Sequence, residues 1–159
     1  MPFLGIVAML VAQNFYGSLP IDGVECNPIE GANEHVHVAL QMYDRGKRVA
    51  VPANVGISQS AGCLYWIHTH DASGFIHIEA PVVKNYTLGQ FFDIWGRDLN
   101  WQRADGVVAP HGSRLSIWVN GTAWHGSDPR TIVLRNHETI VIQNGPPFAK
   151  PSKTQWGEL

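Results

Sequence analysis

The stretch CLYWIHTHDASGFIHIEA, residues 63–80, constrains the fold more than any other feature of the chain. Its centre, DASG, is a turn signal, and the residues on both sides are rich in strand formers. Side chains alternate between the two faces of a strand. A hairpin with Asp71 opposite Gly74 therefore places His68 opposite His77. A slip of one residue would instead scatter the histidines onto both faces.

In that register the two faces of the hairpin differ in chemistry. The face that suits a hydrophobic core carries Tyr65, Ile67, Thr69, Ile76 and Ile78. The other face carries Trp66, His68, His70, Phe75, His77 and Glu79. It brings three imidazoles and a carboxylate within reach of one another across the strands. The hairpin therefore predicts a core on one side and a cluster of imidazoles on the other.

Similar strand-like runs recur along the chain and are separated by turn signals. They read HVHVALQMY, KRVAVP, RLSIWVN, TIVL and TIVIQ. This pattern predicts a mainly β fold of antiparallel strands, arranged as a small barrel or a sandwich. One short helix is predicted near 87–95, because Thr87 and Gln90 have capping-box spacing and Gly96 suits the end of a helix.

The chain of 159 residues suits one domain, which we place at residues 21–147. Residues 1–20 are a hydrophobic N-terminal segment, either a packed strand or helix or the remnant of a targeting or anchoring sequence. Residues 148–159 are Pro-rich and predict an irregular tail. The formal net charge is −2 without a basic stripe, which argues against nucleic acid as a partner. Membrane contact is expected only through an N-terminal anchor, and the oligomeric state stays open.

Five of the eight histidines lie in strand-like sequence. In EHVHVAL, two histidines share one face of a strand, as two do in IHTH. Neutral imidazole suits copper, zinc, nickel and iron, whereas calcium and magnesium prefer oxygen ligands. The sequence therefore predicts a transition-metal site whose ligands are His35, His37, His68, His70 and His77.

Three carboxylates are candidates for an added oxygen ligand or for an acceptor that fixes an imidazole tautomer: Glu79, Asp71 and Glu34. An ion with an open coordination position could activate water or dioxygen, with Glu79 as general base and Asp71 in an auxiliary catalytic role. A closed site would instead store or carry the ion. The sequence leaves open whether the protein is an enzyme acting on a small molecule, by copper redox chemistry or by zinc hydrolysis or lyase chemistry.

The two cysteines, Cys26 and Cys63, predict a disulfide, with a thiolate ligand as the alternative. A disulfide implies an oxidising compartment, so we expect an extracytoplasmic protein that is periplasmic, secreted or membrane-anchored. The remaining histidines, His111, His125 and His137, lie in turn-like sequence and are expected to be exposed.

A second hypothesis comes from a different class of function. In a structural or interaction module without metal, the histidines would hydrogen-bond to one another. A surface rich in tryptophan would then bind a partner or a carbohydrate, through Trp66, Trp101, Trp118 and Trp124. Metal content separates the two hypotheses.

The motifs together resemble an uncharacterised family of bacterial proteins, many of them exported or membrane-anchored. The shared pattern reads IDGVEC…E (21–30), HVHVAL (35–40), VPANVGI (51–57), CLYWIHTHDASGFIHIEAP (63–81), YTLGQFFDIWG (86–96), VNG (119–121) and DPRTIVL (128–134). The resemblance covers about residues 21–145. It implies an extracytoplasmic location and brings no activity with it.

A local resemblance concerns copper. GCLYWIHTH is similar to the G-x-Y-W-Y-H-S-H motif of multicopper oxidases, and HVH is similar to their H-W-H, which together hold type 2 and type 3 copper. This chain is far shorter than those enzymes and lacks their H-C-H motif, so the resemblance does not extend to the whole enzyme. Cupins likewise present an H-x-H pair on a strand, with a longer spacing to the next ligand. The resemblance implies copper as the first choice of ion and zinc as the second.

Overall fold

The computed structural model describes residues 18–157 of the chain. The hydrophobic segment predicted at 1–20 therefore lies almost entirely outside the described residues. Residues 148–157, predicted as an irregular tail, form neither helix nor strand.

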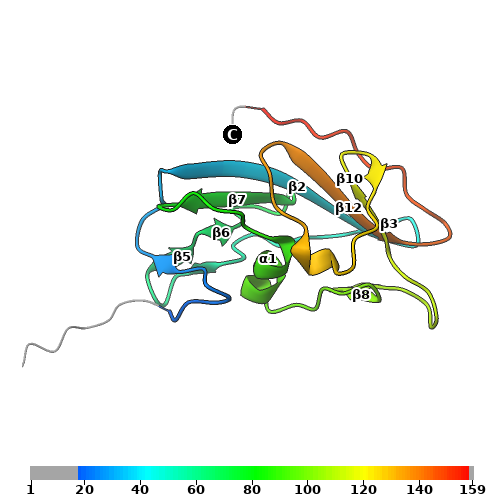
Figure 1. Ribbon diagram of the computed structural model, residues 1–159, viewed down its shortest axis with the longest axis horizontal. Helices are drawn as coiled ribbons and strands as arrows, with labels where there is room; N and C mark the ends of the chain where they lie inside the picture. Colours follow the sequence, from blue (N-terminus) through cyan, green and yellow to red (C-terminus); the bar gives the residue numbers. More distant parts are fainter. Residues whose placement is uncertain (1–17, 158–159) are drawn as a thin grey trace, which may run out of the picture.

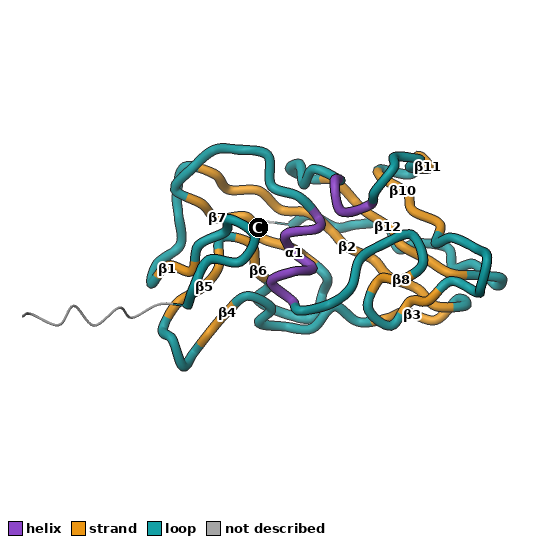
Figure 2. The backbone as a smooth tube through the Cα atoms, turned by 60° about the horizontal axis from the view of Figure 1, so that its bottom comes forward, coloured by secondary structure: helices purple, strands orange, loops and turns teal. Residues whose placement is uncertain are grey.

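The fold is mainly β, as predicted. Its elements are β1 (Cys26–Asn27), β2 (Glu34–Asp44), β3 (Lys47–Val49), β4 (Ile57–Ser58), β5 (Cys63–Tyr65), β6 (Ile67–His68), β7 (Phe75–Ala80), α1 (Leu88–Trp95), β8 (Arg103–Ala104), β9 (Val107–Val108), β10 (Ser116–Val119), β11 (Thr122–Ala123) and β12 (Glu138–Asn144). Figure 2 shows β1, β4 and β5 together at one end of the molecule and β10 and β11 at the other.

The largest sheet has seven strands. Six follow one another in the order β11-β10-β12-β2-β7-β6, and β3 also pairs with β2. β12 pairs with β2 in parallel, whereas the other pairs are antiparallel. A three-stranded sheet, β1-β5-β4, and the β8-β9 pair lie beside it. Within residues 18–157 the order stays open at both ends, so the arrangement is sandwich-like and not a closed barrel.

The run TIVL at 131–134 does not form the predicted strand. The chain instead makes a 3-10 turn over Pro129–Thr131, and only Val133 forms an isolated bridge. The turn forms in place of a strand for two reasons. Pro129 fixes its own φ, and the Asp128 side chain accepts a hydrogen bond from the Arg130 N–H at 2.9 Å.

The single α-helix of the described residues, α1, begins and ends where the sequence predicts. The Thr87 hydroxyl accepts from the Gln90 N–H, and the Gln90 side chain accepts from the Thr87 N–H, which forms a capping box. Gly96 closes the helix at a φ of +69°. Phe91 and Phe92 are fully buried in the core.

The core fills the space between α1 and one face of the large sheet. Figure 1 shows α1 below β2 and β7, with the C-terminal segment above them. Ile67, Ile76 and Ile78 belong to the same buried cluster as the helix phenylalanines. Side chains alternate along a strand. In β6 and β7, the residues next to these isoleucines along the strand therefore point to the opposite, outer face.

The hairpin register matches the prediction, since His68 pairs with His77 and Ile67 with Ile78. The alternation does not continue through Trp66, however. The strand is interrupted there: the Trp66 N–H donates to the Glu25 carbonyl, while the Trp66 carbonyl accepts from the Glu79 N–H. β5 and β6 consequently belong to different sheets. Trp66 is buried in the core instead of joining the histidine face, which corrects that part of the prediction.

The predicted disulfide between Cys26 and Cys63 is present and joins β1 to β5. It ties the segment before β2 to the start of the histidine hairpin. A disulfide of this kind indicates an oxidising compartment. In the described part of the chain, no helix has the length and apolar character that crossing a bilayer requires.

Candidate metal centre

Three neighbouring strands carry the predicted histidines on the outer face of the sheet. In the pairing of β2 with β7, His37 lies opposite His77, and His35 lies opposite Glu79. β6 adds His68 opposite His77 from the other side. His70 follows β6 at the start of the turn. We call the five imidazoles together the histidine cluster.

His68 is the most buried member of the cluster, with no exposed surface. Its Nδ1 lies 2.8 Å from the Tyr65 carbonyl oxygen. Because a carbonyl only accepts, Nδ1 must carry the proton, and the lone pair of the neutral ring is on Nε2. That Nε2 lies 3.3 Å from His70 Nε2 and 3.4 Å from Glu79 Oε2.

Glu79 lies at the centre of the cluster, and its side chain is almost completely buried. Oε1 lies 3.2 Å from His35 Nε2 and 3.8 Å from His77 Nδ1. Oε2 is buried without a hydrogen-bond partner, and so is His77 Nδ1. Buried polar atoms in folded proteins almost always have a partner, so these two atoms require one.

The rings contact one another closely around His77. Its ring centroid lies 4.5 Å from that of His70 and 4.6 Å from that of His37, both in edge-to-face contact. The rings of His77 and His68 are stacked at 5.8 Å. His37 is in turn 4.8 Å from His35. The cluster is therefore continuous across β2, β7 and β6.

Burial keeps the inner imidazoles neutral. It lowers the pKa of His68 to about 4, against the opposing effect of the hydrogen bond to Tyr65. Burial, reinforced by His70 and His37, lowers the pKa of His77 to about 3. The pKa of His37 is also lowered, first by burial and then by His35. At neutral pH these rings keep their lone pairs, which is the form that binds metal.

A second carboxylate, which sequence reasoning missed, completes the site. Glu30 lies 3.9 Å from His70 Nε2 through its Oε1. Burial raises the pKa of Glu79, and the charge of Glu30 raises it further. Among the described residues, no lysine or arginine forms an ion pair with either carboxylate. The site is thus rich in lone pairs and negative charge, which suits a cation.

Glu30 reaches the site because of the backbone beside it. The Gly31 N–H donates to the Glu79 carbonyl at 3.2 Å. A Cβ on Gly31 would lie 2.2 Å from the carbonyl carbon of Ala80, so only glycine fits there. The sequence does carry one sign that Glu30 could reach the site. The pair Glu30-Gly31 follows Cys26 closely, and the disulfide of Cys26 holds this segment against the hairpin.

The donor atoms form two groups that could each hold a metal ion. One group consists of Glu30, His68, His70 and Glu79, and the other of His35, His37 and Glu79. Within each group the donor atoms lie within 4.8 Å of one another. The structure thus brings together all five predicted histidines and Glu79, with His77 packed between the two groups.

Two other predicted carboxylates lie outside both groups. Asp71 is exposed in the turn, where its Oδ1 accepts from the Ser73 N–H at 2.8 Å. The hydrogen bonds from Ser73 lower the pKa of Asp71. Its auxiliary catalytic role stays a prediction. Glu34 precedes His35 and so has the opposite parity in β2, and its charge acts on Tyr86, a core residue. Glu34 therefore lies apart from the histidine cluster, and its role as an added ligand stays a prediction.

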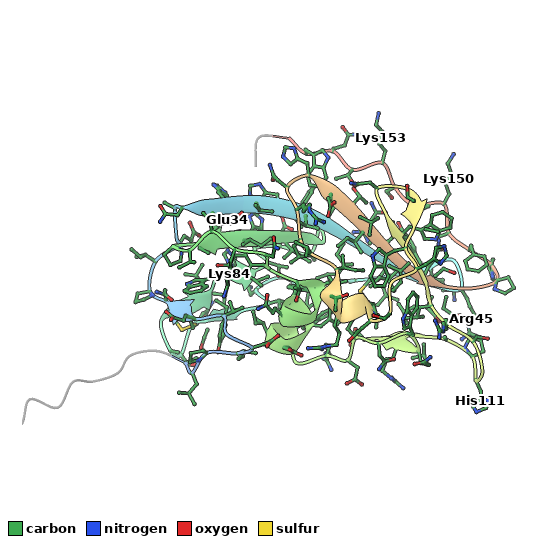
Figure 3. All side chains as sticks on the ribbon, viewed as in Figure 1. Glu34, Arg45, Lys84, His111, Lys150 and Lys153 are labelled. Atoms are coloured by element: carbon green, nitrogen blue, oxygen red, sulfur yellow. A yellow bond between two sulfur atoms is a disulfide. The ribbon has the colours of Figure 1, made fainter. Side chains whose placement is uncertain are left out.

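The three remaining histidines are exposed, as expected. Figure 3 shows His111 at the tip of a loop, far from the Glu34 end of β2. His137 nevertheless borders the cluster, since its N–H donates to the His37 carbonyl at 2.8 Å and its ring stacks on Trp156 at 4.7 Å. The turn-like sequence around His137 gave no sign of this position.

Comparison with known proteins gives no relative. The chain matches no protein-family model, no curated protein and no solved structure. Its function must therefore be inferred from the geometry of the histidine cluster and its two carboxylates.

Proposed function

We propose that the protein is a small extracytoplasmic metal-binding protein whose histidine cluster binds a transition-metal ion, copper first and zinc second. One observation carries the proposal. The Nε2 lone pair of His68 and Oε2 of Glu79 are both hydrogen-bond acceptors, and they lie 3.4 Å apart in a buried position. Two buried acceptors repel each other unless a proton or a cation lies between them. A metal ion satisfies both, together with His70.

The donor chemistry supports the choice of ion. Imidazole nitrogens with one or two carboxylates suit copper and zinc, and Cu²⁺ binds such ligands more tightly than the other divalent ions of the first row. The single disulfide leaves no thiolate among the described cysteines, which removes the ligand that most favours Cu(I). The oxidising compartment that the disulfide indicates supports an extracytoplasmic location.

Elemental analysis of protein purified without an affinity tag tests the proposal. We expect at least one copper or zinc ion per chain, and a large loss of metal in the double variant His68→Asn, Glu79→Gln. The control is His111→Ala, which alters an exposed histidine remote from the cluster. An ion that binds only the native state at a hundred times its Kd raises stability by about 2.7 kcal/mol. Metal-free protein that gains no thermal stability from copper or zinc would refute the proposal.

The second hypothesis, a module that binds a partner or carbohydrate, retains one observation. Trp101 and Trp124 stack at 5.6 Å and, with Trp118, line a pocket of about 310 Å³. Trp66 does not contribute, because it is buried in the core. A titration with soluble oligosaccharides that quenches tryptophan fluorescence in the parent but not in Trp124→Ala would support this function.

A further inference from the structure

Glu79 presents its two carboxylate oxygens to different parts of the histidine cluster. Oε1 lies nearest to His35, at 3.2 Å from Nε2. Oε2 lies 3.4 Å from Nε2 of His68. The two candidate ligand groups share this residue and no other. A carboxylate with donors gathered at both oxygens has the arrangement of a bridging ligand.

The donors are numerous enough for two ions. The group at Oε2 has His68, His70 and Glu30 besides Glu79, which makes four ligands. The group at Oε1 has His35 and His37. The nearest further donor is His77, whose buried Nδ1 has no hydrogen-bond partner and lies 3.8 Å from Oε1. With His77 this group also reaches four ligands, the usual number for zinc.

We propose that the histidine cluster is a dinuclear metal centre in which Glu79 bridges two ions. One ion is bound by Glu30, His68, His70 and Oε2 of Glu79. The other is bound by His35, His37, His77 and Oε1 of Glu79. The inference rests on the proposed metal-binding function and adds to it the number of ions and the role of each ligand.

Two features of the structure fit this arrangement better than a single ion. First, each atom of the histidine cluster and Glu79 that is buried without a partner receives one: Oε2 of Glu79 from the first ion and Nδ1 of His77 from the second. Second, the two carboxylates supply negative charge between and beside the cations, which reduces the repulsion between them. Glu79 is then a ligand to both ions and not the general base that the sequence suggests.

The experiment measures ion stoichiometry and magnetic coupling on the full-length, tag-free protein. Metal-free protein is titrated with Zn²⁺ and counted by native mass spectrometry, and a Cu²⁺-loaded sample is examined by electron paramagnetic resonance. We expect two ions per chain and a copper signal weaker than the copper content, because a bridging carboxylate couples the two spins.

Single variants assign the ions to the two groups. His35→Ala and His70→Ala each remove an exposed ligand, so they leave the fold intact and should each lower the count from two ions to one. Glu79→Gln preserves the shape of the bridge but should abolish the coupling. His111→Ala is the control and should keep two coupled ions.

The possible failures are distinguishable. A parent protein that binds no ion overturns the proposed function together with the dinuclear centre. A parent that binds one ion overturns only the dinuclear centre. The bridge through Glu79 is overturned by either of two results. One is two bound ions with a full, uncoupled copper signal; the other is two ions retained in both His35→Ala and His70→Ala.

Discussion

Lowering the pH from 7 to 5 should destabilise the metal-free protein through its buried imidazoles. The pKa of His68 is about 4 in the folded protein and 6.5 as its ordinary value. The unfolded chain therefore binds a proton in this range that the folded chain does not. Stability rises with pH wherever the unfolded state binds more protons. The contribution of His68 is thus complete above pH 6.5 and is lost as the pH falls toward 4.

The size of the effect follows from these two values. Between pH 7 and pH 5 the unfolded His68 takes up most of one proton, which costs the folded state about 2 kcal/mol. His77, whose pKa is about 3, adds a similar loss of about 2 kcal/mol. Glu79 acts in the opposite direction, because its pKa is raised by burial and it gains a proton more readily when folded. His37, whose pKa is also lowered by burial, adds to the loss. The two innermost imidazoles alone account for about 4 kcal/mol, a large share of the roughly 5–15 kcal/mol typical of a domain.

Urea unfolding in the presence of a chelator, followed by tryptophan fluorescence, measures this loss. His68→Asn keeps a side-chain N–H for the Tyr65 carbonyl but does not titrate, so the pH dependence should shrink by about 2 kcal/mol relative to the parent. The control, His111→Asn, should leave the dependence unchanged. A free energy of unfolding that is equal at pH 7 and pH 5, or an unaltered slope in His68→Asn, would refute the assignment of neutral buried imidazoles.

Three further predictions concern the frame around the cluster. Replacing Cys26 and Cys63 by alanine opens a loop of 37 residues and should cost about 4 kcal/mol of stability, and an unchanged urea midpoint would contradict this. Thr87→Ala removes the helix cap and should cost about 1 kcal/mol without changing metal content; a loss of metal would show that α1 does more than support the core. Gly31→Ala should displace Glu30 and weaken the metal affinity measured by titration. The control is Gly106→Ala, where a Cβ meets only an ordinary contact and the affinity should not change. Equal affinities in the two variants would refute the role of Gly31.

Local sequence predicted the hairpin and the helix correctly for a simple reason. The pairing of His68 with His77 depends on a short turn and on alternation over a few residues. The limits of α1 depend on Thr87, Gln90 and Gly96, which act within one turn of the helix. In both cases the residues that decide the structure are near neighbours along the chain.

Trp66 shows where the local pattern fails. Strict alternation predicts its side chain on the histidine face, but the chain there leaves one sheet and enters another. That change is decided by the Glu25 carbonyl, which accepts the Trp66 N–H and lies far from it in sequence. The alternation rule holds only within an uninterrupted ladder.

The sequence by itself determined which residues could ligate a metal: two H-x-H strands, a fifth histidine and Glu79, all with matching parity. Only the tertiary structure decided that β2 lies beside β7, so that these two halves form one cluster. It also decided that the disulfide and Gly31 bring Glu30 to the site. Parity is fixed by the pleat of each strand, whereas the choice of neighbouring strand and loop depends on contacts between distant segments, which no local pattern encodes.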